Sequence, residues 1–319
     1  MKHKILLGSW LLFMTVVSSR GQNTPRTFPP QLQTTKTAQH VRVLGTNVFG
    51  VFPVGYQFIK QLARYQKNDD LYVQVLESHT SSFERAKAGL SRQAIEAKGA
   101  TVDAWDSLRV NGYEAMYVEG PSKQAGETKL MLAFGDNAFV VMVVGVAKTA
   151  DKAGQAELKA ILQTLYYDRT RPLDPLELAN FSFDQTLTHF AYVSTTSNLF
   201  RYAENGKAAP GDLLANTIQV MALPNTTADK SEEFSQSVLR GYERHGVAIA
   251  TKTVTRTTIH GYPAFVVESP TTLQGKEGVL YQALLVGANS SILFSGSAYQ
   301  DPRKYAELFK KTAETVEIK

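Results

Sequence analysis

The sequence of 319 residues contains no cysteine. Disulfide bonds, thiolate catalysis and cysteine-based metal sites are therefore excluded. Without disulfides, the free energy of folding has to come mainly from a hydrophobic core. The length suits two domains, since domains usually hold about 100–200 residues.

Sequence motifs that carry known chemistry are also missing. No Gly-x-Ser-x-Gly, Ser-x-x-Lys, His-Glu-x-x-His or phosphate-loop pattern occurs. The six histidines have no spacing typical of metal ligands. We therefore assign no catalytic, metal or cofactor residue from the sequence and expect no cofactor.

A positively charged field is missing as well, although the formal net charge is +5. Three basic residues lie in the first 21 positions and three more lie between positions 22 and 43, so the region from Leu44 onward carries −1. Nucleic acids and anionic membranes bind clustered Lys and Arg. Neither is expected as a partner of this region.

The N-terminus has the pattern of an export signal, which we assign to residues 1–21. Lys2 and Lys4 precede an apolar run of about 13 residues from Ile5 to Val17, and small residues follow it. A membrane span needs about 20 apolar residues, so we expect cleavage near Gln22. The protein is then exported, to the periplasm or the extracellular space, without a transmembrane segment.

Residues 22–43 are predicted to form a flexible linker. The segment contains Pro25, Pro29 and Pro30 among many Thr and Gln residues, and its apolar residues show no helical or strand period.

The remainder of the chain contains an internal repeat. The segment Asn111-Gly112-Tyr113-Glu114-Ala115 matches His260-Gly261-Tyr262-Pro263-Ala264 at a shift of 149 positions, and further matches keep the same order on both sides. The sequence therefore predicts two tandem repeats, residues 44–168 and 176–319. A short hinge with Pro172 and Pro175 joins them, so we expect the two copies to touch.

Each repeat has the same predicted order of strands, helix, two hairpins and helix. In the first copy, Ser81 and Glu84 have the capping-box spacing and Gly99 suits a helix end. Asn111-Gly112 is the strongest signal for a two-residue hairpin turn, because both residues tolerate positive φ. This order predicts an α+β fold in which each repeat is an antiparallel sheet packed between helices, an α/β/α sandwich.

The element order resembles the PsbP-like α/β/α sandwich family. The resemblance depends on the hairpin at Asn111-Gly112-Tyr113, the turn at Gly135 with its apolar return strand, and the closing helix Leu158–Leu165. It implies a binding or assembly factor rather than an enzyme. No metal or partner residue of the family maps onto this chain.

Two residues are candidates for contact with a ligand. Trp105 lies on the first hairpin, where an exposed indole can stack on a ligand ring; packing on the sheet is the alternative. His79 follows a strand and precedes a capped helix, where a loop ligand can be held; a solvated loop residue is the alternative. Glu119 and Glu268 occupy equivalent positions, and we interpret them as turn-capping residues.

The leading functional hypothesis is an exported, non-enzymatic binding or assembly factor whose partner is a protein. One alternative is a carrier that holds a small apolar ligand between sheet and helices. Another is a hydrolase whose site combines scattered acidic residues with His79.

Overall fold

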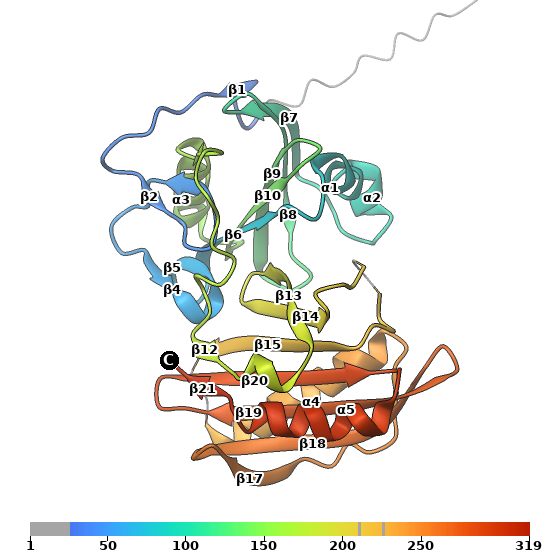
Figure 1. Cartoon of the computed structure of the whole chain (residues 1–319). Coiled ribbons are helices and arrows are strands. Elements are labelled where there is room, and N and C mark those ends of the chain that lie inside the picture. The colour runs from blue at the N-terminus through green and yellow to red at the C-terminus, as the bar shows by residue number, and fades with distance from the viewer. Residues whose placement is uncertain (1–25, 210–211, 225–226) are drawn as a thin grey trace, which may run out of the picture.

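The computed structural model describes residues 26–209, 212–224 and 227–319. The expected signal peptide, residues 1–21, lies outside them. The described chain is mixed α/β with two large, mainly antiparallel sheets that follow one another along the sequence (Figure 1). We refer to residues 26–168 as the first unit and to residues 176–319 as the second unit.

The first sheet has eight strands in the order β1-β7-β8-β9-β10-β6-β5-β4. Their bounds are β1 (Gln31–Leu32), β4 (Gln57–Ile59), β5 (Arg64–Asn68), β6 (Leu71–Ser78), β7 (Ala104–Val110), β8 (Tyr113–Pro121), β9 (Glu127–Gly135) and β10 (Val140–Lys148). A small sheet of β2 (Val41–Arg42), β3 (Val48–Gly50) and β11 (Tyr166–Tyr167) accompanies it. The helices are η1 (Lys60–Leu62), α1 (Phe83–Gly89), α2 (Arg92–Glu96) and α3 (Lys152–Gln163).

The second sheet has the order β13-β14-β15-β20-β19-β18-β16, and β17 also pairs with β18. Its strands are β13 (Phe190–Thr196), β14 (Leu199–Glu204), β15 (Thr217–Pro224), β16 (Ala248–Ile249), β17 (Thr255–Ile259), β18 (Tyr262–Leu273), β19 (Lys276–Val286) and β20 (Ser290–Ala298). The remaining elements are β12 (Phe181–Ser182), which pairs with β21 (Glu317–Ile318), and the helices η2 (Gln185–Leu187), α4 (Ala228–Arg244) and α5 (Pro302–Ala313).

Helices cover both faces of each sheet because successive strand residues point to opposite sides. In β8, Ala115 and Tyr117 join the core under α3, whereas Met116 and Val118 join the core under α1. The same alternation in the second sheet separates α5 from α4, which lie in front of and behind the sheet in Figure 1.

The two predicted hairpin turns are confirmed. Asn111 and Gly112 have φ of 48° and 86°, and His260 and Gly261 have 48° and 81°. Positive φ at both central residues is the requirement of a type I′ turn, which is why an Asn-Gly or His-Gly pair stands there.

The predicted helix from Ser81 to Gly99 is wrong in detail, since it consists of the two short helices α1 and α2. Ser82, rather than Ser81, is the N-cap of α1 and accepts a hydrogen bond from Arg85 N at 3.4 Å. Ser91 then accepts from Ala94 N at 3.2 Å and donates to Ala88 O at 3.1 Å. These local side-chain bonds end one helix and begin the next.

The prediction of a flexible linker at residues 22–43 is wrong for the part that the structure describes. Phe28, Leu32 and Val43 are buried in the first core, and Phe28 packs edge-on against Tyr117 with ring centroids 4.7 Å apart. The buried carboxylate of Asp106 accepts hydrogen bonds from the Thr27 and Phe28 amides at 2.8 and 3.3 Å. Widely spaced apolar residues anchor an extended segment without producing any helical or strand period.

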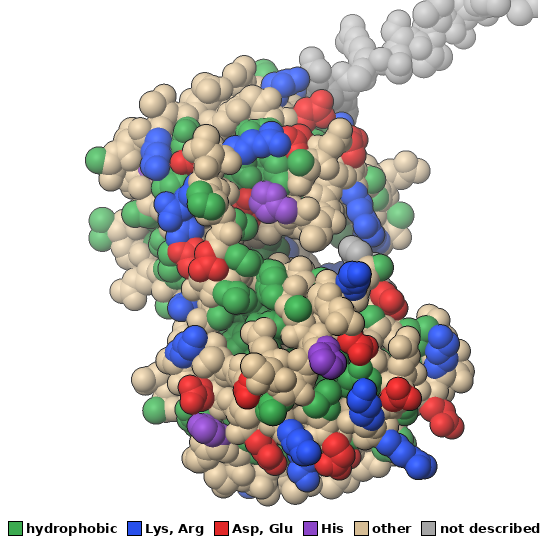
Figure 2. Space-filling view, viewed as in Figure 1, with side chains coloured by type: hydrophobic (Ala, Val, Ile, Leu, Met, Phe, Trp, Pro, Cys, Tyr) green, Lys and Arg blue, Asp and Glu red, His purple; other side chains and the backbone are tan. Residues whose placement is uncertain are grey.

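The two units touch, as the short hinge predicts. Ala63, at the end of η1, is buried in the core of the second unit. Across the same junction, the Asn198 amide donates to Gln61 O at 2.6 Å and the Gln74 amide donates to Ser197 Oγ at 2.7 Å. In Figure 2, hydrophobic side chains gather where the units meet, and charges of both signs are scattered over the rest of the visible face.

Candidate ligand cavity

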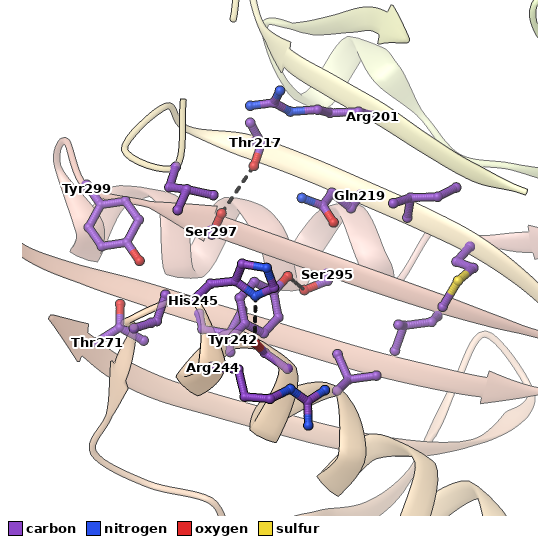
Figure 3. A pocket seen from close by; sticks show the side chains of 18 of the residues that line it. Arg201, Thr217, Gln219, Tyr242, Arg244, His245, Thr271, Ser295, Ser297 and Tyr299 are labelled. Atoms are coloured by element: carbon purple, nitrogen blue, oxygen red, sulfur yellow. Dashed lines mark hydrogen bonds between the residues drawn. The ribbon is translucent and has the colours of Figure 1, made fainter. Parts of the chain in front are cut away.

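A cavity of about 500 Å³ lies between α4 and the second sheet (Figure 3). Strands β14, β15, β19 and β20 form its floor, and α4 with the segment that follows forms its other side. Its apolar lining comes from Leu199, Leu213, Met221, Val238, Val247, Leu280, Leu293, Tyr242 and Tyr299.

The cavity results from small and polar residues on one face of the two central strands. On β15, Thr217 and Gln219 line it while Ile218 and Val220 fill the opposite core. On β20, Ser295 and Ser297 stand where larger apolar side chains would otherwise fill the space. These short side chains leave room beneath the helix, and room of this size is what a small-molecule site requires.

Hydrogen bonds between polar residues keep the walls in place. The Tyr242 hydroxyl on α4 lies 2.9 Å from Ser295 Oγ, and Thr217 Oγ1 lies 3.1 Å from Ser297 Oγ (Figure 3). Burial raises the pKa of the Tyr242 hydroxyl, which therefore stays neutral at physiological pH. Tyr242 thus ties α4 to β20, in addition to the apolar contacts that Val238 and Leu239 make with the sheet.

Glycine at position 241 widens the cavity on the helix side. A Cβ atom built there would have the Arg244 Nη2 atom as its nearest neighbour, at 3.9 Å. Gly241 lies inside α4, where glycine destabilises a helix by roughly 0.5–1 kcal/mol relative to alanine. Nothing in the backbone geometry requires this glycine, because its φ is not positive.

Several polar groups border the cavity. Arg201 Nη2 donates to Asp212 O at 3.0 Å, while its buried Nε atom has no hydrogen-bond partner in the described part of the chain. The hydroxyl of Thr271, a residue only 4% exposed, likewise lacks a partner within the described ranges. His245 closes the last turn of α4 with its Nδ1 atom 2.9 Å from Gly241 O. The cavity therefore combines an apolar interior with a few buried groups that can accept or donate hydrogen bonds.

In the first unit, the layer between the sheet and its short helices is filled. Trp105 packs with Met131 and Met142 between the first sheet and the short helices α1 and α2. Its indole N–H donates to Leu90 O at 3.1 Å. Val254 stands at the matching position of the second unit, 149 positions later, where it packs on the cluster that also contacts Phe234 and Val238 of α4, and it does not line the cavity. The structure thus places Trp105 in a core, where it serves as a filler.

The structure places His79 at the junction of the units, in a separate cavity of about 220 Å³. Its Nε2 atom lies 2.8 Å from Glu77 Oε1. The Glu77 side chain is fully buried and also accepts hydrogen bonds from Asn47 N at 2.6 Å and from the Tyr167 hydroxyl at 2.9 Å. His79 and Trp105 lie at different sites, so the structure does not bring the two sequence candidates together.

The interpretation of Glu119 as a turn-capping residue is wrong. Glu119 lies within β8 and is only 8% exposed; it accepts a hydrogen bond from the Tyr117 hydroxyl and forms an ion pair with Lys159 Nζ, each at 2.8 Å. Its counterpart Glu268 is exposed on β18. The equivalent sequence positions therefore differ in environment.

The described residues include neither a metal-ion cluster nor a membrane-spanning helix. No group of three or more His, Asp or Glu side chains there is placed to hold a metal ion. No helix within the described ranges is long and apolar enough to cross a membrane.

Comparison with known proteins gave only weak structural similarities. No family model matches the sequence, and no curated protein matches it. LpqN of Mycobacterium tuberculosis, described as involved in cell envelope biogenesis, aligns with 12% identity and a TM-score of 0.34 over 43% of this chain and 82% of its own.

Two further solved structures cover different shares of the chain. The immunity protein TplEi of the type VI secretion system from Pseudomonas aeruginosa aligns with 9% identity and a TM-score of 0.28, over 88% of this chain and 97% of its own. Cyanobacterial PsbP from Synechocystis aligns with 12% identity and a TM-score of 0.25, over 48% of this chain and 100% of its own. The similarity to PsbP-like proteins is therefore present but weak, and these scores assign the chain to none of the three families.

Proposed function

We propose that the chain is an exported, non-enzymatic binding protein whose second unit holds a small, mostly apolar molecule between α4 and the second sheet. The observation that carries the proposal is the cavity of about 500 Å³, which lies within the usual range of ligand pockets. Leaving such a space under a helix forfeits contacts and costs stability. A bound apolar molecule would restore those contacts.

Duplication of one PsbP-like module is part of the proposal. Read from β4, the first sheet runs β4-β5-β6-β10-β9-β8-β7, and the second runs β13-β14-β15-β20-β19-β18-β17 by the same chain order. The matched type I′ turns at Gly112 and Gly261 support the same correspondence. One copy with a filled interior and one with a cavity is the pattern expected when a duplicated module specialises.

Export to the periplasm or the extracellular space is the second part. It is supported by the basic start, the short apolar run and the small residues before Gln22. The absence of cysteine suits either compartment, since no thiol is exposed to oxidation.

A fluorescence titration with the apolar dye 1-anilinonaphthalene-8-sulfonate tests the cavity. We expect saturable binding to the folded chain with one site in the second unit. Gly241→Leu should abolish it, because the leucine side chain projects into the cavity without meeting another atom near its Cβ. Gly241→Ala is the matched control, since it makes the same change in the helix backbone but leaves most of the volume free.

Comparing the two variants separates an effect on dye binding in the cavity from an effect on the stability of the fold. Both should melt at or above the wild-type temperature, because each replaces a helix-interior glycine. Loss of dye binding in Gly241→Leu alone supports the cavity. Equal dye binding in all three proteins would show that the dye binds elsewhere, and the proposal would fail.

A further inference from the structure

The outer edge of the first sheet, at β7, is covered by β1, a strand that belongs to none of the unit's hairpins. Strand β1 pairs in parallel with β7, and Arg109 N and Asn111 N donate to Pro30 O and Leu32 O, each at 2.9 Å. Every other strand pairing among the described residues is antiparallel. This edge therefore shows how an extended segment docks on the module.

The matching edge of the second sheet is β17, which lies at the outside of the sheet in Figure 1. Ile259 and Tyr262 flank the two-residue turn and bond to each other, so the N–H groups of Thr258 and His260 point away from β18. No described residue outside the hairpin hydrogen-bonds either group. Four of the five β17 residues are exposed. An exposed strand edge of this kind is a template for another strand.

A groove continues from this edge in the second unit but is filled in the first. In the first unit, Asn111 Nδ2 donates to Thr34 O at 3.3 Å, and His40 Nε2 lies 2.9 Å from Thr164 O at the end of α3. In the second unit, an open groove of about 310 Å³ lies between His260 and the end of α5. Each unit thus has such an edge and groove, but only those of the first unit are occupied by another segment of the chain.

The charge of the open groove indicates what would fill it. Asp184, Glu314 and Glu317 line it. In the first unit, the covering segment places Lys36 Nζ 3.7 Å from the centre of the Phe49 ring, and the charge of Lys36 contributes to lowering the pKa of Asp168 after the hydrogen bonds from Thr170. Lys36 follows the paired residue Leu32 by four positions. An acidic groove is complementary to a basic residue at the same spacing.

We propose that the β17 edge and the adjoining acidic groove bind an extended segment of another protein by strand addition. The segment runs parallel to β17, accepts hydrogen bonds from Thr258 N and His260 N, and carries a Lys or Arg four residues beyond its second paired residue. Backbone hydrogen bonds supply affinity in this mode, and the side-chain groove supplies specificity. The chain's own segment from Arg26 to His40 cannot serve, because it is packed into the first unit.

A fluorescein-labelled peptide of residues 26–40 is a suitable probe, since this sequence already docks on the equivalent edge. We expect it to bind the full chain, as measured by fluorescence anisotropy. Thr258→Pro removes the outward N–H and should weaken binding by about tenfold, the effect of one lost backbone hydrogen bond with its partner left unmet. Thr258→Val keeps the N–H and is the matched control, with unchanged affinity. A peptide with Lys36→Ala should also bind more weakly.

Hydrogen exchange keeps the test decisive if Thr258→Pro fails to fold. In the wild-type chain, the peptide should slow exchange of the Thr258 and His260 amides while leaving Arg109 and Asn111 unchanged. Absence of binding, protection of the first unit alone, or equal binding to Thr258→Pro would overturn the proposal. Dimerisation of the free chain through the Thr258 edge would show that the edge binds a second copy of the chain instead of another protein. That result would also overturn the proposal.

Discussion

The two units share one strand order but fill their interiors differently. In the first unit, Trp105 occupies the space between sheet and helices, and the segment from Arg26 covers the open edge. In the second unit, a cavity lies under the long helix α4, and the edge at β17 is uncovered. The difference teaches that one strand order can carry either a packed layer or a cavity, depending on a few side chains and on the segment that covers the edge.

The helices that cover this face of the sheet also differ in length between the two units. Helices α1 and α2 have 7 and 5 residues and cover a compact cluster that includes Phe83 and Leu90. Helix α4 has 17 residues and packs on the sheet through Leu239. A long helix can span an unfilled space because its own backbone hydrogen bonds do not depend on the floor beneath it.

The largest expected effect concerns the covering segment. A fragment of residues 26–169 should be folded, whereas a fragment of residues 44–169 should be largely unfolded. The shorter fragment loses the buried side chains of Phe28 and Leu32, whose removal costs about 3–5 and 2–5 kcal/mol. Together these approach the whole stability of a domain, about 5–15 kcal/mol. Amide dispersion in an NMR spectrum checks both fragments, and equal dispersion would show that the segment is dispensable.

Removing the filler of the first unit comes next. Trp105→Ala should lower the free energy of unfolding by roughly 2 kcal/mol, less than the 3–5 kcal/mol of a fully buried tryptophan because this side chain is half-buried. Denaturant unfolding measures the loss. If the contrast between the units depends on this residue, the variant should also gain a second dye-binding site. Val254→Ala, at the matching position of the second unit, is the control and should gain none.

The two hairpin turns should respond alike. Gly112→Val and Gly261→Val each force a β-branched residue to positive φ, at an expected cost of roughly 1–3 kcal/mol. Neither new Cβ atom meets another group within 4 Å, so the effect isolates backbone strain. Thermal unfolding of both variants checks the prediction. An unchanged melting temperature in one of them would mean that its turn relaxes to another type.

The smallest effect concerns the junction and depends on pH. Burial alone would raise the pKa of Glu177, but hydrogen bonds from Arg42 and Gly45 N outweigh it and lower the pKa below the ordinary 4.5. A lowered folded-state pKa means that this carboxylate stabilises the fold above pH 4.5 and that the contribution disappears as pH falls through the folded value. Wild type should therefore lose stability below pH 4.5 more steeply than Glu177→Gln. Parallel pH profiles would exclude a role of this ion pair at the junction.

The sequence predicts the fold class and the turns well because these depend on local chemistry. The Asn111-Gly112 pair specifies positive φ at two adjacent positions, and alternating apolar residues specify two-sided sheets. The role of residues 26–43 was not predictable, since docking of Phe28 depends on Asp106 and Tyr117 far along the chain.

A ligand held between sheet and helices was one of the alternatives, but the residues that line the cavity could not be predicted for a related reason. The cavity's signal is the pair of short polar residues Ser295 and Ser297, which alternate with β20 residues of the opposite core such as Phe294 and Ala298. In one sequence, such an alternation is read as a solvent-facing side of a strand. Only the packing of α4 over that side turns it into a cavity. Trp105 and His79 are the candidates for ligand contact that the sequence suggests, and neither lines the cavity.

NMR mapping of the dye on the full chain tests the central claim most directly, because it reports both units in one experiment. We predict amide shift changes confined to α4 and to β14, β15, β19 and β20 around the cavity, with the residues near Trp105 unmoved. Shift changes centred on the first unit, or spread evenly over both, would contradict the proposal that the second unit binds the ligand.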